Sequence, residues 1–402
     1  MKILQIHVRL DSGCVGHIVR NLYSEIKSKG HDCKIAYARG GIGNIPVEDT
    51  IKICSELEVK KHALMTRFFG RTAFYSRKST IDFLKKVDEY NPDVVHIHGV
   101  YGYYINMPLL FDYLKSKKIH VVSTLHSCWD FTGHCCYFDF VNCEQWKNCC
   151  VKCPQKASYP RSSFLENTKK NYILKKQLYD GLDNCTIATP SKWMENLARQ
   201  SFLKKHKIVT VPNGIDTNVF KRIPADTLGY GIDRTKPLIL CIANVWNKRK
   251  GWDDVVELSN FVKKKNVQLL VVGVNDKQKK VLGTKAICIS RTTNIQELAL
   301  IYNAATIFFN PTYEDNYPTV NIESIACGTP VVTYATGGSP EAVERFNMGS
   351  IVEKKDFAKL ISLAEKYFKL GKAKKNINEE LSFKRMSSEY LKVYDFSLKE
   401  SC

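Results

Sequence analysis

The sequence lacks long apolar runs. No segment approaches about 18 uninterrupted apolar residues, so a transmembrane helix is not expected. The first ten residues, MKILQIHVRL, place His7 and Arg9 where a secretory signal peptide keeps an apolar segment. We therefore expect a cytoplasmic protein. In that compartment the fifteen cysteines are expected as reduced thiols or metal ligands rather than as disulfides.

Acidic residues are scarce relative to basic ones. Lys and Arg number 60 against 40 Asp and Glu, which gives a formal net charge of +20. Such an excess attracts phosphate-rich partners, among them nucleic acid, nucleotide sugars and anionic lipid. Charge alone does not choose among these three.

Short β-branched runs alternate with longer amphipathic segments along the chain. KILQIHV, CKIAYA and DVVHIH lie in the first half, and LILCIAN, VQLLVVG and PVVTYA in the second. Strands separated by helices predict parallel sheets, so we expect an α/β fold of two Rossmann-like, doubly wound domains facing each other across a cleft. Turn formers at 212–214 mark the joint. The expected parts are 1–211, 212–376, and a helix in 377–402 that packs back towards the first domain.

Five stretches carry a resemblance to a known family. They are SGCVGHIVRNLYSEIKSKGHD, VSTLH, VPNGIDTNVF, NKRKGWDDVVEL and PTYEDNYPTVNIESIACGTPVVTYATGGSPE. In this order and spacing they resemble the GT-B glycosyltransferases of the retaining group 1 type, called family 4. The resemblance implies a UDP- or GDP-sugar donor and a glycan acceptor. Many members of the family build bacterial surface polysaccharides. It also implies catalysis without a metal or a protein nucleophile.

Two acids are the first site residues that the resemblance implies. In the family, acids separated by seven residues contact the sugar hydroxyls and the ribose hydroxyls, and Asp315 and Glu323 have this spacing. The usual first acid is Glu, and Glu314 lies one residue out of register, so it could share the role of Asp315. A helix beginning near Thr319 would point backbone N–H groups at a diphosphate. By spacing alone, both acids could instead flank a solvated loop.

A basic loop is the second element. Lys250 matches the family's lysine, which neutralises the diphosphate, whereas the arginine expected six residues earlier is Asn244. We expect Arg249 or Lys248 to supply the missing charge. The alternative is a solvated basic turn.

Two further features lie in the first half. His126, at the end of a predicted strand, matches a family histidine that faces the transferred sugar, and His98 is a weaker candidate; a strand-end histidine is otherwise structural. DSGCVGH lacks the G-x-G-x-x-G fingerprint, but its glycines match the family's small-residue loop, which is otherwise a tight turn. The residues expected at the donor are Gly13, Gly16, Asn244, Arg249, Lys250, Asn316, Tyr317, Pro318, Thr319 and Glu323. Those expected in catalysis are His126, Lys250, Asp315 and Glu323.

Seven cysteines cluster in residues 128–153. Cys150 and Cys153 form a C-x2-C pair typical of structural zinc, with Cys135 and Cys143 as partners, and His134, Cys136 and Cys149 as alternative ligands. Such a zinc ion would shape the acceptor side without taking part in the chemistry. Buried free thiols or an adventitious disulfide are the other interpretations.

Residues 60–86 interleave cations with aromatic residues. This composition suits the surface of an anionic membrane, where a lipid-linked acceptor would be presented. A solvated helix face with its aromatic residues in the core is the alternative.

The sequence therefore predicts a retaining, metal-independent glycosyltransferase for bacterial surface polysaccharide, cytoplasmic or at the inner face of the membrane. Two alternatives stay open. One is a nucleotide-sugar epimerase or phosphorylase on the same fold. The other is a basic zinc protein that binds nucleic acid, which is disfavoured because the cysteine segment has no recognisable finger register.

Overall fold

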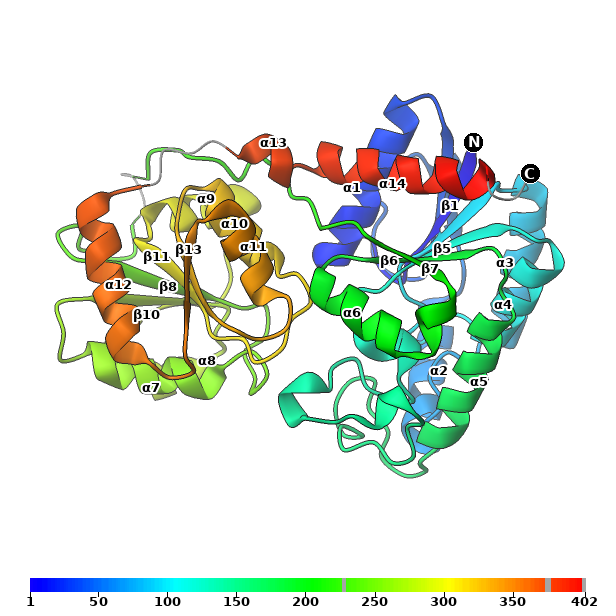
Figure 1. The fold of residues 1–402 in the computed structure, drawn as a ribbon, viewed down its shortest axis with the longest axis horizontal. Coiled ribbons are helices and arrows are strands. Elements are labelled where there is room, and N and C mark those ends of the chain that lie inside the picture. Colours follow the sequence, from blue (N-terminus) through cyan, green and yellow to red (C-terminus); the bar gives the residue numbers. More distant parts are fainter. Residues whose placement is uncertain (226–228, 373–376, 400–402) are drawn as a thin grey trace. The chain divides into compact units, whose positions relative to one another are not determined.

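The computed structural model describes residues 1–225, 229–372 and 377–399. Contacts between residues in space divide the chain into two compact units (Figure 1). Unit 1 comprises Met1–Pro212 and Met386–Cys402, and unit 2 comprises Asn213–Arg385. The chain thus leaves the first unit once and returns to it at the end. Among the described residues, no helix combines the length and the apolar character needed to cross a bilayer.

Unit 1 is built on a parallel sheet, which has seven strands in the order β3-β2-β1-β4-β5-β6-β7 within the described residues. The strands are β1 (Lys2–Ile6), β2 (Asp32–Tyr37), β3 (Thr50–Lys52), β4 (Val94–Ile97), β5 (His120–Thr124), β6 (Cys185–Thr189) and β7 (Lys207–Thr210). The helices are α1 (Cys14–Ser28), α2 (Glu56–Phe69), α3 (Arg77–Tyr90), α4 (Met107–Ser116), α5 (Thr168–Asp180) and α6 (Lys192–Gln200).

Unit 2 repeats the plan with six described strands in the order β10-β9-β8-β11-β12-β13, all parallel. The strands are β8 (Leu238–Ile242), β9 (Gln268–Val272), β10 (Ile287–Ile289), β11 (Ile307–Asn310), β12 (Val331–Tyr334) and β13 (Gly349–Val352). The helices are α7 (Trp252–Val262), α8 (Asp276–Leu282), α9 (Ile295–Ala304), α10 (Thr319–Ala326), α11 (Ser339–Phe346), α12 (Phe357–Leu370) and α13 (Asn378–Leu381), followed by α14 (Phe383–Lys399).

Both faces of the unit 2 sheet are covered, which explains its continuous apolar strands. Successive strand residues point to opposite faces. Leu240 packs into a core with α9, α10 and α11, whereas its neighbour Cys241 packs into a second core with α7 and α12. In β11, Phe308 packs into the first of these cores and Phe309 into the second.

The strand orders place a topological switch point in each sheet, where the order of the strands reverses. It lies between β1 and β4 in unit 1 and between β8 and β11 in unit 2. In open α/β sheets ligands bind outside the carboxyl ends of the strands at such a point. The loops after β8 and β11 are therefore the first place to look for a site in unit 2.

Helix α14 closes unit 1 with two tyrosines. The Tyr394 hydroxyl lies 2.7 Å from Nδ1 of His96, and the Tyr390 hydroxyl lies 3.0 Å from Oγ1 of Thr124. All four residues are buried. Helix α14 thus supplies polar partners to β4 and β5.

Candidate active site

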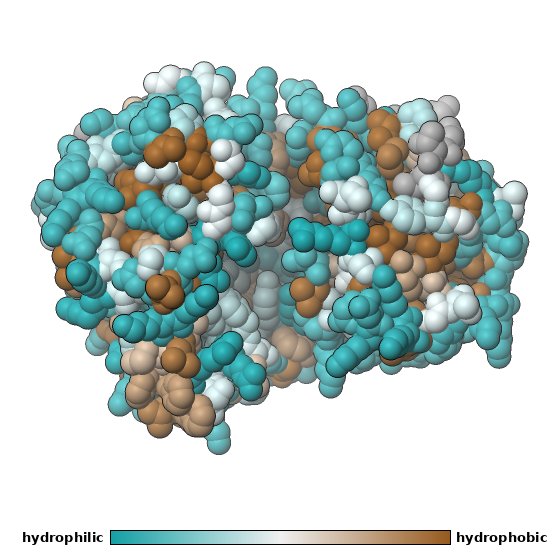
Figure 2. Space-filling model, turned by 180° about the vertical axis from the view of Figure 1, so that it is seen from behind, coloured by the Kyte–Doolittle hydropathy of each residue, from teal (hydrophilic) through white to brown (hydrophobic). Residues whose placement is uncertain are grey.

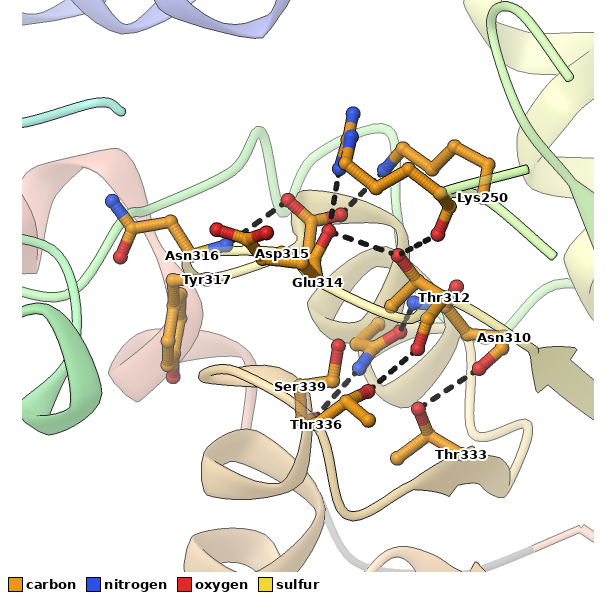
Figure 3. Close-up of polar contacts among 12 residues, drawn as sticks. Lys250, Asn310, Thr312, Glu314, Asp315, Asn316, Tyr317, Thr333, Thr336 and Ser339 are labelled. Carbon is orange, nitrogen blue, oxygen red and sulfur yellow. Dashed lines mark hydrogen bonds and ion pairs between the residues drawn. The ribbon is translucent and has the colours of Figure 1, made fainter. Parts of the chain in front are cut away.

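The loop that follows β11 is held in place by hydrogen bonds from three elements. Nδ2 of Asn310 donates to Oδ1 of Asn321 in α10 at 2.8 Å, and Nδ2 of Asn321 donates to the Ser339 carbonyl of α11 at 3.0 Å (Figure 3). The Thr333 hydroxyl of β12 donates to the Asn310 carbonyl at 2.9 Å. Because these groups are buried, each bond is costly to break, and the loop is fixed relative to the sheet.

Asp315 and Lys250 meet across the switch point. Nζ of Lys250, from the loop after β8, lies 2.5 Å from Oδ2 of Asp315, from the loop after β11 (Figure 3). Their side chains are 23% and 15% exposed. Burial raises the pKa of the Asp315 carboxyl, but the cations of Lys250 and Arg249 outweigh it and hold that pKa below its ordinary value. Asp315 is therefore an anion at neutral pH.

Arg249 lies at the same loop, where its NH1 donates to the Glu314 carbonyl at 2.5 Å. Asn244, six residues before Lys250, is exposed. The structure thus puts Arg249 and Lys250 at the Asp315 loop. That Arg249 or Lys248 supplies the charge missing at Asn244 stays a prediction.

Glu314 and Asp315 differ in burial although they are adjacent. Glu314 is fully buried, and its carbonyl accepts hydrogen bonds from Arg249 and from the Thr312 hydroxyl. Asp315 is partly exposed and bears the ion pair. Of the two acids, Asp315 is thus the one that a ligand can reach.

Gly337 packs closely against the backbone of Asp315, and Gly338 donates a hydrogen bond to it. Gly337 has φ of 57°, and a Cβ added there would lie 2.2 Å from the Asp315 carbonyl oxygen. The Gly338 N–H donates to the same oxygen at 2.9 Å. Only a residue without a side chain permits this approach. Sequence reasoning did not assign a role to these glycines, although the TGG segment was part of the family resemblance.

Glu323 lies in α10, which begins at Thr319 directly after Pro318. The Tyr302 hydroxyl, from α9, donates to Oε2 of Glu323 at 3.0 Å. Burial raises the pKa of Glu323 to about 7, against the lowering effect of this hydrogen bond. Glu323 therefore titrates near neutral pH, whereas Asp315 does not. Sequence reasoning missed Tyr302, because its contact with Glu323 arises only when α9 packs against α10.

The other residues expected at the donor lie around this loop. Asn316 and Tyr317 are buried, and the Tyr317 carbonyl accepts a hydrogen bond of 3.2 Å from Nδ2 of Asn213. Asn213 belongs to the turn at the start of unit 2, which the sequence indicated only as a joint.

In unit 1, the expected glycines have different surroundings. Gly13 is exposed and precedes α1 with φ of 81°. Gly16 is buried in α1, where an added Cβ would lie 2.8 Å from the Arg9 carbonyl oxygen. Gly16 thus serves the packing of α1 against the loop after β1.

His126 follows β5 and is joined to a group of histidines. Its Nε2 lies 3.1 Å from Nδ1 of His98, which follows β4. His7 follows β1, and its Nδ1 lies 3.1 Å from the His98 carbonyl. Burial lowers the pKa of His126 to about 3 and that of His7 to about 4, so both are neutral at physiological pH.

The cysteine-rich segment folds into short 3-10 turns. Cys135, Cys143, Cys150, Cys153 and His134 line one small cavity together with Trp146 and Phe138. Within residues 1–225, 229–372 and 377–399, however, no group of three or more His, Cys, Asp or Glu side chains is arranged to hold a metal ion. The cysteines in that part of the chain are free thiols. Structural zinc stays a prediction, which elemental analysis of protein purified without added metal tests.

Two Rossmann-type parallel sheets, each with a topological switch point, are the architecture of the GT-B glycosyltransferases. The profile of Glycosyltransferase Family 4 matches residues 15–219, and that of Glycosyl transferases group 1 matches residues 236–369. The first match spans half of the chain, so the protein belongs to Glycosyltransferase Family 4. The predictions of family and fold are confirmed.

Individual relatives agree with this assignment. The chain is 23% identical over 391 residues to the putative colanic acid biosynthesis glycosyl transferase WcaC of Escherichia coli K12, covering 91% of this chain and 90% of WcaC. A solved glycosyltransferase from Rickettsia africae ESF-5 has a TM-score of 0.66 and 17% identity, covering 99% of this chain and 98% of that one. HepE of Anabaena, solved in complex with UDP, has a TM-score of 0.62 and 12% identity, covering 98% and 100%. At these identities the solved structures show the fold alone.

Proposed function

We propose that this glycosyltransferase moves a sugar from a UDP- or GDP-sugar to a glycan acceptor with retention of anomeric configuration, in the synthesis of a bacterial surface polysaccharide. WcaC, which is named for colanic acid biosynthesis, supports the polysaccharide product, and the UDP complex of HepE supports a nucleotide donor. Family membership favours transfer over epimerisation, phosphorolysis or nucleic-acid binding.

The observation that carries the proposal is the pairing of Lys250 with Asp315 at the switch point of unit 2. Lys250 and Arg249 would neutralise the donor diphosphate as it leaves, and the first N–H groups of α10 would point at the same phosphates. Fixed cations already in place need no reorganisation during the reaction. In this proposal they supply the charge that a metal ion supplies in other enzymes.

The two acids would hold hydroxyl groups on either side of the diphosphate. Asp315, ionised throughout the neutral range, would accept hydrogen bonds from the sugar, and Glu323 from the ribose. The acceptor hydroxyl would attack the anomeric carbon on the face that the diphosphate leaves, and a phosphate oxygen would take its proton. The protein then contributes positioning and charge stabilisation.

The experiment has two stages. Thermal shift with UDP-glucose, UDP-galactose, UDP-N-acetylglucosamine, GDP-mannose and GDP-fucose identifies the donor, which should raise the Tm through binding to the folded state. Nucleotide release is then measured with each hit, and proton NMR gives the anomeric configuration of the product. Binding with retention supports the proposal. Inversion, or no binding by any nucleotide sugar, contradicts it.

We further propose that the acceptor is lipid-linked and that unit 1 contacts an anionic membrane through an exposed apolar surface. This α2 surface consists of Leu64, Met65, Phe68, Phe69, Phe164 and Leu165. The rings of Phe68 and Phe164 stack at 4.8 Å, and the Leu165 N–H donates to the Phe68 carbonyl at 2.9 Å. Figure 2 shows brown surface gathered at the lower left, over the part of unit 1 where Figure 1 places α2.

Cations accompany the α2 surface on the same helix. Lys60, Lys61 and Arg67 are exposed, which suits a negatively charged headgroup layer. The double variant F68S/F164S should lose sedimentation with phosphatidylglycerol vesicles, whereas L370S, which changes a 68% exposed leucine in unit 2, should not. Equal sedimentation of the double variant and the wild type would refute membrane contact at this surface.

A further inference from the structure

Three histidines follow neighbouring strands at the switch point of unit 1. His7, His98 and His126 come directly after or close to the carboxyl ends of β1, β4 and β5. Ligands of open α/β sheets bind at this place. In a neutral histidine only one imidazole nitrogen carries a hydrogen. The tautomer of each of the three rings therefore determines whether a ligand meets a hydrogen-bond donor or an acceptor there.

Gln5 in β1 fixes the first of these hydrogens. Its Nε2 donates to the Val19 carbonyl at 3.3 Å, and the flipped amide would set two oxygens against each other. Oε1 of Gln5 therefore faces Nε2 of His98 at 3.2 Å. An amide oxygen only accepts hydrogen bonds, so Nε2 of His98 carries the hydrogen.

The tautomer of His98 determines the tautomer of His126. Burial lowers the pKa of His98 well below its ordinary value, so the ring is neutral and has one N–H, at Nε2. Nδ1 of His98 is then an acceptor, and Nε2 of His126, 3.1 Å away, must donate to it. Because His126 is also neutral, its Nδ1 carries a lone pair.

His7 is fixed in the opposite tautomer. Its Nδ1 lies 3.1 Å from the His98 carbonyl, which only accepts, so Nδ1 carries the hydrogen and Nε2 the lone pair. Among the described residues, no protein group bonds to Nδ1 of His126 or Nε2 of His7. Although both atoms lack a protein partner among these residues, neither is a buried atom, so both are accessible to solvent.

We infer that Gln5 and His98 are positioning residues that hold His126 and His7 in these tautomers, and that Nε2 of His7 accepts a hydrogen bond from a hydroxyl group of a neutral sugar, beside the contact already expected of His126, which its Nδ1 would make. An imidazole lone pair accepts a hydrogen bond from a hydroxyl group but repels a phosphate oxygen. The inference assigns His7 to the substrate and rests on the proposed function for the identity of the ligand as a sugar.

The tautomers are measured directly by proton–nitrogen correlation NMR on the full chain with labelled histidine at pH 7.5. His126 should be protonated at Nε2 only and His7 at Nδ1 only, with assignments from the loss of signals in H126N and H7Q. Q5L should leave His126 with a mixture of tautomers, although Gln5 does not touch it. Protonation of His126 at Nδ1 in the wild type would overturn the inference, as would an unchanged His126 in Q5L.

Substitutions give a second readout. Asn places an amide oxygen near the position of a histidine Nδ1, and Gln places one near Nε2. H126N should therefore retain about tenfold more turnover of the best donor than H126Q, and H7Q about tenfold more than H7N, as expected for one hydrogen bond. A purely structural role would not reverse the ranking between the two positions. The same ranking at both contradicts the assignment.

The two readouts separate this inference from the proposed function. The NMR measurement of the tautomers needs no substrate. It therefore tests whether Gln5 and His98 set the tautomer of His126 even if no nucleotide sugar is turned over. A wild type that shows the expected tautomers but transfers no sugar would contradict the proposed function and leave the tautomers of His7 and His126 established.

Discussion

Asp315 and Glu314 are neighbours in the chain, but their side chains meet different conditions. Asp315 is partly exposed and paired with Lys250, whereas Glu314 is fully buried. D315A should therefore lower transfer more than E314A does, by about tenfold or more, since a hydrogen bond to a charged group contributes on the order of 1.5 to 3 kcal/mol. E314A should instead lower the Tm, because it removes a fully buried side chain and leaves a cavity. Steady-state rates and thermal unfolding of both variants check this, and a greater loss of turnover in E314A would put the register of the acids one residue earlier.

Glu323 makes donor affinity depend on pH. Ribose hydroxyls donate to the ionised carboxylate, and the pKa of about 7 means that the carboxyl is increasingly protonated below neutral pH. Protonation removes the acceptor, so the affinity for UDP-glucose should fall about tenfold per pH unit below pH 7. E323Q should bind more weakly than the wild type at pH 8 and should show a flatter profile. Calorimetry between pH 5.5 and 8 measures both, and parallel profiles would exclude Glu323 as the titrating group.

The sequence could identify residues whose role follows from local spacing, and it could not identify those whose role arises from packing. Motifs predicted Asp315, Glu323 and Lys250 as site residues, and the structure brings Asp315 and Lys250 together. Tyr302, Gln5 and His7 were not assigned, because their contacts arise from packing. Gln5 and His98, for example, are 93 positions apart in the chain. Nothing in the local pattern around Gln5 distinguishes it from any polar residue in a strand.

At the scale of elements, the site depends on the turn between β12 and α11. Gly337 and Gly283 both have left-handed backbone, with φ of 57° and 55°, but only Gly337 contacts another segment, the Asp315 backbone. G337A should displace the Asp315 loop and abolish most donor binding. G283A should leave donor binding unchanged and show only backbone strain, on the order of 1 to 3 kcal/mol, because φ of 55° with ψ of −133° is sparsely populated by residues other than glycine.

Calorimetric titration of both glycine variants with the same nucleotide sugar, together with their Tm values, gives the comparison. If G337A binds the donor as tightly as G283A does, the turn does not support the site.

The elements themselves were predicted well where strands read as buried apolar runs. Fold class was therefore accessible from sequence, and the strand orders of both sheets follow the doubly wound pattern. The cysteine-rich segment was less accessible. Its C-x2-C spacing is typical of zinc, but the conformation of the 26-residue stretch depends on how its aromatic residues pack, for example Phe138 on Trp146 at 4.9 Å.

At the scale of the whole molecule, unit 1 is made from both ends of the chain. Its stability therefore depends on α14, whose Tyr394 hydroxyl is the partner of the buried His96. Y394F should leave a polar atom of His96 unpaired and lower the free energy of unfolding by about 1 to 3 kcal/mol. Y367F removes a hydroxyl of α12 at 3.3 Å from Ser350 and should have less effect. Denaturant unfolding of both variants tests this, and equal losses would show that α14 contributes no specific hydrogen bond.

The whole account depends on nucleotide-sugar binding by unit 2, and the most direct test is calorimetry of the best donor with the wild type, K250A and K277A. Lys277 is an exposed lysine of α8 in the same unit, so K277A makes the same change in charge away from the site. We predict that K250A weakens binding by at least about tenfold and that K277A binds as the wild type does. Equal affinities of all three proteins would contradict the assignment of Lys250 and Asp315 to the donor.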